Sequence, residues 1–176
     1  MSDEWFDIVD EDDRVVGQAP RAACHGNPSL IHRVAHVLVF NQEGQLLLQL
    51  RSRNKDIQPG RWDTSVGGHL DPGESYRQAA CREMREELGI VGAPLTFLYA
   101  SKIRNEVESE NVATYLAHYD GAIAFSCEEI EAVRFWEPGE IEAALGSGLF
   151  TPNFEEEWAH WRRWLSCPSS MQSPPK

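Results

Sequence analysis

The chain has 176 residues, of which 41% are hydrophobic and six are tryptophan, so it is long enough to form one globular domain with a proper core. Its 28 acidic residues outnumber its 16 Lys and Arg residues and give a formal net charge of −12. This surplus of negative charge argues against nucleic-acid polymers as partners, because their binding depends on cationic side chains. Small phosphorylated ligands stay compatible with it, since a local basic cluster and a metal ion can override the net charge.

The sequence shows no membrane span and no export signal. No apolar run approaches the ~18 residues of a transmembrane helix, and the N-terminus lacks the pattern of a targeting segment. Four cysteines are scattered without a C-x-x-C pair, which favours reduced thiols: Cys24, Cys81, Cys127 and Cys167. We therefore expect a cytoplasmic protein with no membrane partner.

Two β-hairpins are predicted in the N-terminal third of the chain. Residues 5–9 and 14–17 are apolar runs on either side of an acidic turn. Residues 34–40 and 45–50 flank the turn sequence Asn-Gln-Glu-Gly and give the clearer hairpin signal. A loop rich in charged and turn-forming residues follows at 51–61.

A helix is predicted between Ser75 and Gly89. Ser75 and Gln78 form the capping-box pattern S-x-x-Q, and Gly89 can end the helix in a left-handed conformation. Apolar residues recur at four-residue steps and would face the core: Ala80, Met84 and Leu88.

Three carboxylates share one face of this helix, because Glu83, Glu86 and Glu87 stand at positions i, i+3 and i+4. Such like charges repel one another, and a bound divalent cation would remove the conflict. Mg²⁺ in particular prefers carboxylate, phosphate and water oxygens as ligands. The alternative interpretation of the three glutamates alone is a solvated acidic face.

The chain beyond this helix is predicted to add three strands and two helices. The strands lie at residues 95–103, 112–118 and 133–136. One helix starts at residues 137–140 and runs to about Leu145.

The closing helix, at residues 153–165, is amphipathic, with large apolar side chains on one face: Phe154, Trp158, Trp161 and Leu165. Residues 166–176 are rich in Ser and Pro and are expected to be disordered. No internal repeat or linker divides the remainder, so residues 1–165 are predicted to form a single domain.

The most specific pattern in the chain is the stretch 68–90, GHLDPGESYRQAACREMREELGI. It resembles the Nudix box, G-x5-E-x7-R-E-U-x-E-E-x-G-U with U a bulky apolar residue. Every defined position matches: Gly68, Glu74, Arg82, Glu83, Met84, Glu86, Glu87, Gly89 and Ile90. The resemblance implies an α+β Nudix fold, an α/β/α sandwich with a mixed β-sheet and a central box helix.

The same resemblance implies an activity and a role for each box residue. Nudix hydrolases cleave a diphosphate linkage in nucleoside diphosphate derivatives or nucleoside di- and triphosphates, with Mg²⁺ or a similar cation such as Mn²⁺. Catalysis and metal binding then fall to Glu83, Glu86 and Glu87, with the Gly68 backbone beside the metal. Structural roles fall to Gly68, Gly89 and an ion pair between Glu74 and Arg82.

Gly67 and Gly68 are expected either to let the backbone approach metal or phosphate closely, or to adopt positive φ. A plain tight turn is the alternative explanation for two adjacent glycines.

A second resemblance covers residues 7–140, which are similar to the isopentenyl-diphosphate isomerase-like branch of the Nudix superfamily. The matching motifs include residues 49–55, 59–62 and 65–69. In the isomerases, three histidines and two glutamates bind a divalent metal, which here implies His25, His32, His69, Glu108 and Glu110. The alternative for each histidine is a hydrogen-bonded structural or surface residue.

The isomerase resemblance also implies contacts to the substrate diphosphate from Arg51 and Lys55, and Arg21 is a third candidate. Guanidinium and ammonium groups suit phosphate oxygens, and ordinary surface charge is the alternative. One departure is decisive: this chain has Gly67 where the isomerases have a catalytic cysteine in S-V-C-G-H. Glycine offers no side chain for proton transfer, which favours a hydrolase over an isomerase.

The sequence leaves several points open. The general base is Glu83, Glu108 or Glu110, because this role moves within the family. A non-catalytic nucleotide-binding module is a further alternative, but such modules usually lose box carboxylates. Nudix proteins are often dimers, so a homodimer is also expected. Three aromatic residues could stack a base or lie in the core: Trp62, Tyr115 and Trp136.

Overall fold

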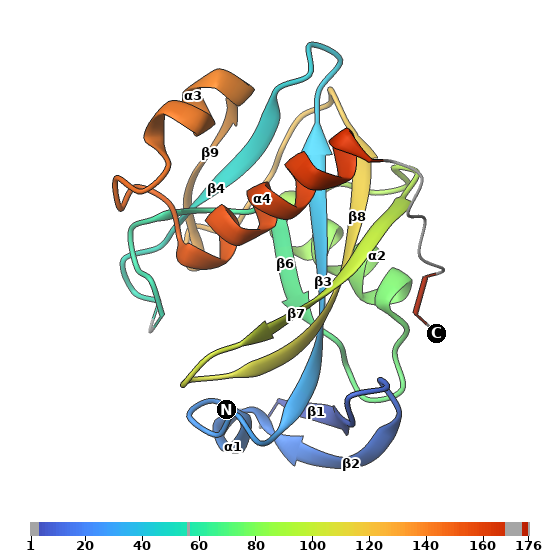
Figure 1. Ribbon diagram of the computed structural model, residues 1–176. Helices are drawn as coiled ribbons and strands as arrows, with labels where there is room; N and C mark the ends of the chain where they lie inside the picture. The colour runs from blue at the N-terminus through green and yellow to red at the C-terminus, as the bar shows by residue number, and fades with distance from the viewer. Residues whose placement is uncertain (1–3, 56, 168–173, 176) are drawn as a thin grey trace.

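The computed structural model describes residues 4–55, 57–167 and 174–175, and these form a mixed β-sheet with helices on both faces (Figure 1). The strands are β1 (Trp5–Val9), β2 (Val15–Pro20), β3 (Ile31–Phe40), β4 (Leu46–Arg51), β5 (Trp62–Asp63), β6 (Val66–His69), β7 (Thr96–Arg104), β8 (Ser109–His118) and β9 (Ile130–Trp136). The helices are α1 (Arg21–Cys24), α2 (Tyr76–Leu88), α3 (Pro138–Ala144) and α4 (Pro152–Ser166). This arrangement agrees with the predicted α/β/α sandwich.

Strand β3 is the centre of the sheet. It runs parallel to β8 along its whole length, and its middle part pairs antiparallel with β6. Strand β7 pairs with β8, strand β4 pairs with β5 and β9, and the β1–β2 hairpin joins the start of β3. Because β3 pairs with β1, β4, β6 and β8, it connects the N-terminal hairpin to the strand that precedes the box helix.

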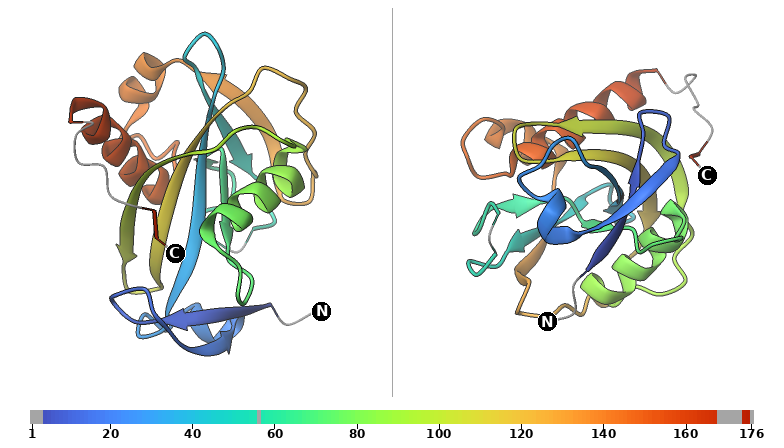
Figure 2. Two further views of the ribbon diagram at one scale, coloured as in Figure 1. Left: turned by 90° about the vertical axis from the view of Figure 1, so that its right-hand side faces the viewer. Right: turned by 90° about the horizontal axis from the view of Figure 1, so that it is seen from below.

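The two faces of the sheet form two separate cores, with α2 on one side and α4 on the other (Figure 2). Successive side chains of a strand point to opposite faces. On β3, the side chains of Ala35, Val37 and Val39 pack with α2, whereas Leu38 and Phe40 pack with α4. Among the described residues, no helix combines the length and apolar character that a membrane crossing requires.

Helix α2 begins and ends where the sequence predicted. The Ser75 side chain accepts a hydrogen bond from the Gln78 backbone, and the Gln78 side chain accepts one from the Ser75 backbone. Gly89 adopts the left-handed conformation with φ of 67°. The three apolar residues predicted to face the core are buried: Ala80, Met84 and Leu88.

Replacing Gly89 with alanine should destabilise the protein by ~1–2 kcal/mol. The alanine would have to keep the positive φ of Gly89, and its Cβ would lie 3.1 Å from the Ala124 Cβ. Thermal unfolding should show a lower Tm. The matched control is Gly139→Ala in α3, where a Cβ would meet no atom within 4 Å and φ is not positive. Equal Tm changes for both variants would contradict this explanation.

Several element boundaries differ from the predictions. Strands β5 and β6 were not predicted, because they are short and β6 contains two glycines, which are rare in strands. Strand β3 begins at Ile31 rather than at residue 34. The N-cap of α4 is Thr151, so the helix starts before residue 153 and includes Ser166. Of the predicted disordered tail, residues 168–173 and 176 lie outside the described residues.

One member of the apolar face of α4 is not buried. Phe154, Trp158 and Trp161 pack in the core, but Leu165 is 45% exposed. It lies on the last turn of the helix and lines a shallow apolar pocket with Phe40 of β3 and Leu116 of β8.

Candidate active site

A cavity of about 840 Å³ collects nearly all of the residues that the sequence singled out. Its walls come from β3, β4, β6, α2, the segment around α1 and the loop before β8. All three box glutamates line it, and so do Arg21, Arg51, Lys55, His25, His69, Glu108 and Glu110. His32 is fully buried beside the other two histidines. Segments far apart in the sequence therefore meet at one site.

The box carboxylates are held by neighbouring side chains. Arg82 Nη1 lies 2.6 Å from Glu83 Oε1 and 3.2 Å from Glu86 Oε2. Gln49 of β4 donates a hydrogen bond of 2.9 Å to Glu87 Oε2. Glu86 is exposed, whereas Glu83 and Glu87 are partly buried.

Burial and mutual repulsion disfavour the negative charges of two box glutamates. Burial raises the pKa of Glu87 to about 8, and the charge of Glu83 adds to the effect. Burial also raises the pKa of Glu83, although Arg82 opposes the shift. These oxygen donors fit a hard divalent cation, because a bound cation would stabilise both ionised carboxylates.

Gly68 lies against Glu83. A Cβ at Gly68 would be 2.0 Å from the Glu83 Cδ atom, so a larger residue there would displace the Glu83 carboxylate. Close approach of the Gly68 backbone to a metal or phosphate stays a prediction. The predicted positive φ is wrong for Gly67 and Gly68, and so is the tight turn, because both residues lie in the extended strand β6.

The predicted ion pair between Glu74 and Arg82 is present. Arg82 donates hydrogen bonds of 3.0 and 2.8 Å to the two carboxylate oxygens of Glu74. It also donates one of 2.9 Å to the backbone oxygen of His69. Arg82 therefore ties the loop before α2 to β6, and it positions Glu83 at the same time.

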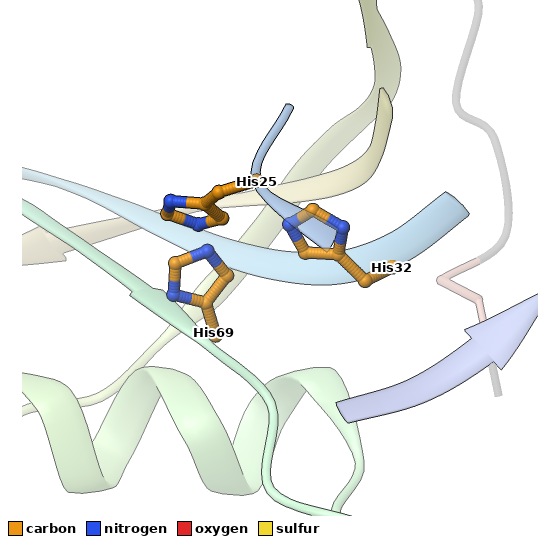
Figure 3. Close-up of side chains that lie close together, drawn as sticks. All are labelled: His25, His32 and His69. Carbon is orange, nitrogen blue, oxygen red and sulfur yellow. The ribbon is translucent and has the colours of Figure 1, made fainter. Parts of the chain in front are cut away.

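Three histidines converge beside the box, as Figure 3 shows for His25, His32 and His69. Their potential ligand nitrogens all lie within 4.8 Å of one another. The Nε2 atoms of all three are buried, and among the described residues that of His25 has no hydrogen-bond partner. Among those residues, no other group of three or more His, Cys, Asp or Glu side chains comes this close together. The three box carboxylates do not do so either.

Two glutamates accompany the histidines. Glu110 Oε1 lies 3.3 Å from His32 Nε2 and 3.6 Å from His69 Nε2. Burial alone would raise the pKa of Glu110, but the two histidines lower it far below its usual value. Burial and the charge of Glu110 raise the pKa of Glu108. The five residues predicted from the isomerase resemblance thus meet in space.

Burial favours the neutral form of two of these imidazoles, although Glu110 opposes the shift. Burial lowers the pKa of both His25 and His69, and the charge of Arg21 acts in the same direction. A neutral imidazole nitrogen is the form that binds metal ions. The cluster therefore offers the donor set that Mn²⁺ or Zn²⁺ accepts.

The three predicted substrate-binding cations line the cavity, but each is already paired. Arg21 lies 2.7 Å from Glu4, Arg51 lies 3.1 Å from Asp63, and Lys55 lies 2.9 Å from Glu129. An incoming phosphate would have to compete with these carboxylates, or shift the side chains away from them.

Sequence reasoning missed polar residues inside predicted strands. Gln49 of β4 and His36 of β3 both line the cavity, and both interrupt apolar strands. That interruption is the signal that could have identified them, because a buried polar side chain requires a partner. Conversely, two of the suggested base-stacking residues are buried in the cores: Tyr115 and Trp136.

Comparison with known proteins agrees with this fold and with the box. A family model described as the NUDIX domain matches residues 30–154. An uncharacterized Nudix hydrolase of Streptomyces coelicolor is 37% identical, over 97% of this chain and 96% of its own length. The uncharacterized Nudix hydrolase YfcD of Escherichia coli K12 is 32% identical, over 92% of this chain and 88% of its own.

Solved structures show the same architecture. The crystal structure of DR0079 from Deinococcus radiodurans superposes with a TM-score of 0.78 and 27% identity, covering 89% of this chain and 98% of that one. A MutT protein from Methanosarcina mazei has a TM-score of 0.65 and 22% identity, covering 78% and 95%.

The sheet, the central box helix and these matches define the Nudix class of proteins. The chain belongs to the Nudix hydrolase family. Membership confirms the predicted α+β Nudix fold and the predicted enzyme class, a pyrophosphohydrolase. The isomerase-like branch remains a prediction.

Proposed function

We propose that this protein hydrolyses a diphosphate linkage in a nucleoside diphosphate derivative or a nucleoside di- or triphosphate, in a reaction that requires Mg²⁺ or Mn²⁺. The observation that carries the proposal is a complete box whose three glutamates line one cavity. Non-catalytic Nudix-fold modules usually lack some of these carboxylates.

The box residues would hold the metal through Glu83, Glu86 and Glu87, with the Gly68 backbone beside them. A bound Mg²⁺ neutralises diphosphate oxygens and lowers the pKa of an attacking water. Arg82 positions Glu83, and Gln49 positions Glu87. Arg82 forms ion pairs with Glu83 and Glu86 in this structure, so both glutamate side chains would have to turn toward the cation to bind it.

A carboxylate must also accept a proton from the attacking water. Glu83, Glu108 and Glu110 all line the cavity and are the candidates for this general base. A glutamine substitution at each position, with kcat measured for each variant, distinguishes them.

Two structural neighbours support a nucleotide-derived substrate. One is described as an Ap4A hydrolase of Caenorhabditis elegans, and the other is a Shewanella oneidensis NrtR Nudix domain complexed with ADP ribose. The paired cations at the cavity wall, Arg21, Arg51 and Lys55, are the groups that would receive the terminal phosphates.

We further propose that the three histidines, with Glu108 and Glu110, bind a second divalent metal. The support is the mutual approach of their ligand atoms within 4.8 Å and the Glu110 carboxylate, whose Oε1 lies 3.3 Å from His32 Nε2 and 3.6 Å from His69 Nε2. The buried Nε2 of His25 has no hydrogen-bond partner among the described residues, which a purely structural role does not explain.

The second site predicts a change in metal content. Protein loaded with Zn²⁺ and then desalted should retain more metal per chain, by elemental analysis, than His69→Ala. Loss of an imidazole ligand should weaken the metal affinity by at least the ~10- to 100-fold that the loss of a ligand's hydrogen-bond partner costs. His118→Ala, at an exposed position on β8, is the matched control. Equal retention by all three proteins would contradict the site.

Isomerisation of isopentenyl diphosphate is the competing activity. Gly67 offers no side chain for it, and a Cβ there would lie 3.2 Å from His36 Cδ2. The test is a panel of nucleoside diphosphate derivatives together with isopentenyl diphosphate, with and without Mg²⁺. Mg²⁺-dependent phosphate release supports the proposal, and formation of dimethylallyl diphosphate without hydrolysis would overturn it.

A further inference from the structure

A buried pair links the sheet to the closing helix beside the cavity. His36 Nδ1 of β3 lies 2.7 Å from Glu157 Oε2 of α4, although the residues are 121 positions apart. Glu157 also accepts hydrogen bonds from the Tyr99 hydroxyl and the Thr114 hydroxyl. A carboxylate with three partners is fixed in place, and it fixes the imidazole in turn.

The hydrogen bond to Glu157 fixes the proton on His36 Nδ1 and the direction in which His36 Nε2 points. A carboxylate only accepts, so the His36 Nδ1 must carry a proton. The Nε2 atom then points away from Glu157, toward Gly67, and lies 3.5 Å from where a Gly67 Cβ would be. His36 lines the cavity, and its hydrogen bond to Glu157 is made by Nδ1, not by Nε2.

Gly67 keeps this nitrogen accessible. A side chain at position 67 would press on the imidazole, since a Cβ would lie 3.2 Å from Cδ2. The Thr64 methyl group lies on the same side, 3.5 Å from where a Gly67 Cβ would be. The cavity wall therefore contains a buried imidazole that Glu157 orients.

We propose that His36 is a substrate-binding residue whose Nε2–H donates a hydrogen bond to a phosphoryl oxygen of the bound diphosphate, with Glu157 as its positioning residue. The inference rests on the proposed function and adds a donor to it. It would supplement Arg21, Arg51 and Lys55, because these cations must leave their carboxylate partners to contact a phosphate, whereas His36 keeps its own.

Electrostatics agree with a protonated ring. Burial would lower the pKa of His36, but the hydrogen bond and charge of Glu157 outweigh it and raise the pKa above its usual value. The charges of Glu110 on β8 and Asp63 on β5 act in the same direction. A diphosphate anion at Nε2 would stabilise the imidazolium further.

The experiment uses methylenediphosphonate with Mg²⁺ as a diphosphate probe that cannot be hydrolysed. Its Kd is measured by calorimetry for the wild type, for His36→Asn and for the control His118→Asn. The asparagine amide nitrogen can still donate to Glu157, but it cannot replace Nε2. We expect His36→Asn to raise the Kd by about 10- to 100-fold, as for the loss of one charge-assisted hydrogen bond, with the control unchanged.

The wild type gives an independent readout. In imidazole ¹⁵N spectra, the probe should shift the His36 Nε2 resonance, which settles the question if His36→Asn does not fold. An unshifted resonance, or a folded His36→Asn with wild-type Kd, would overturn the inference. Hydrolysis of the nucleotide panel by the wild type is measured separately. If the wild type hydrolyses a nucleotide but His36→Asn binds the probe as tightly as the wild type does, only the inference about His36 is refuted. If His36→Asn binds the probe more weakly but the wild type hydrolyses no nucleotide, only the proposed function is refuted.

Discussion

Replacing Glu83 and Glu87 together with glutamine should abolish Mg²⁺-dependent turnover and leave the protein folded. Both carboxylates line the cavity beside Gly68, and glutamine keeps their shape while removing the charge that holds a cation. We expect kcat/KM to fall by about 10³-fold or more, comparable to the loss of several preorganised electrostatic contacts. Phosphate release from an accepted nucleotide substrate is the measurement.

A matched control exists on α4. Glu156 is exposed and lies outside the cavity, so Glu156→Gln should retain wild-type kcat/KM. Circular dichroism and thermal unfolding check that the double variant is folded. A folded double variant with full Mg²⁺-dependent activity would show that the box glutamates do not perform the reaction.

Glu87→Gln alone should stabilise the metal-free protein at pH 8 by ~1–3 kcal/mol. Burial and the charge of Glu83 raise the pKa of Glu87 from 4.5 to about 8 on folding. Between pH 4.5 and about 8, Glu87 is therefore protonated in the folded state but ionised in the unfolded state. This contribution to stability is fully present below pH 4.5 and is lost as the pH rises to about 8, whereas glutamine has no proton to lose.

Urea unfolding in EDTA at pH 4.5 and pH 8 measures the effect. The gain from Glu87→Gln should be small at pH 4.5 and large at pH 8. At pH 8, Mg²⁺ should reduce the difference in unfolding free energy between Glu87→Gln and the wild type. A cation that binds the folded wild type, but not its unfolded state, stabilises it by mass action. A variant less stable than the wild type at pH 8 in EDTA would contradict the raised pKa.

Local chemistry made the box helix predictable. Its N-cap, its C-cap glycine and its buried stripe depend on residues within one or two turns, so spacing alone identifies them. The Glu74–Arg82 ion pair was predicted through the resemblance to the Nudix box, because Glu74 lies in the loop before α2 and outside its periodicity. The glutamates sharing one face of α2 follow from the same periodicity.

Long-range pairing could not be predicted in the same way. The bond between His36 and Glu157 depends on how β3 and α4 meet across the sheet, and nothing in either segment specifies the other. Similarly, the sequence identified Arg51 and Lys55 as cations but not the carboxylates that pair with them. The histidine cluster was predicted only through its resemblance to the isomerases, because its members come from three separate segments.

The most direct test of the metal-binding box is anomalous diffraction from crystals soaked in Mn²⁺. We predict a peak at coordination distance from Glu83 and Glu87, beside the Gly68 backbone. That result would require the Arg82 contacts to Glu83 and Glu86 to open. Density for Mn²⁺ elsewhere, with the box carboxylates still bound to Arg82 and no ion near them, would contradict the mechanism.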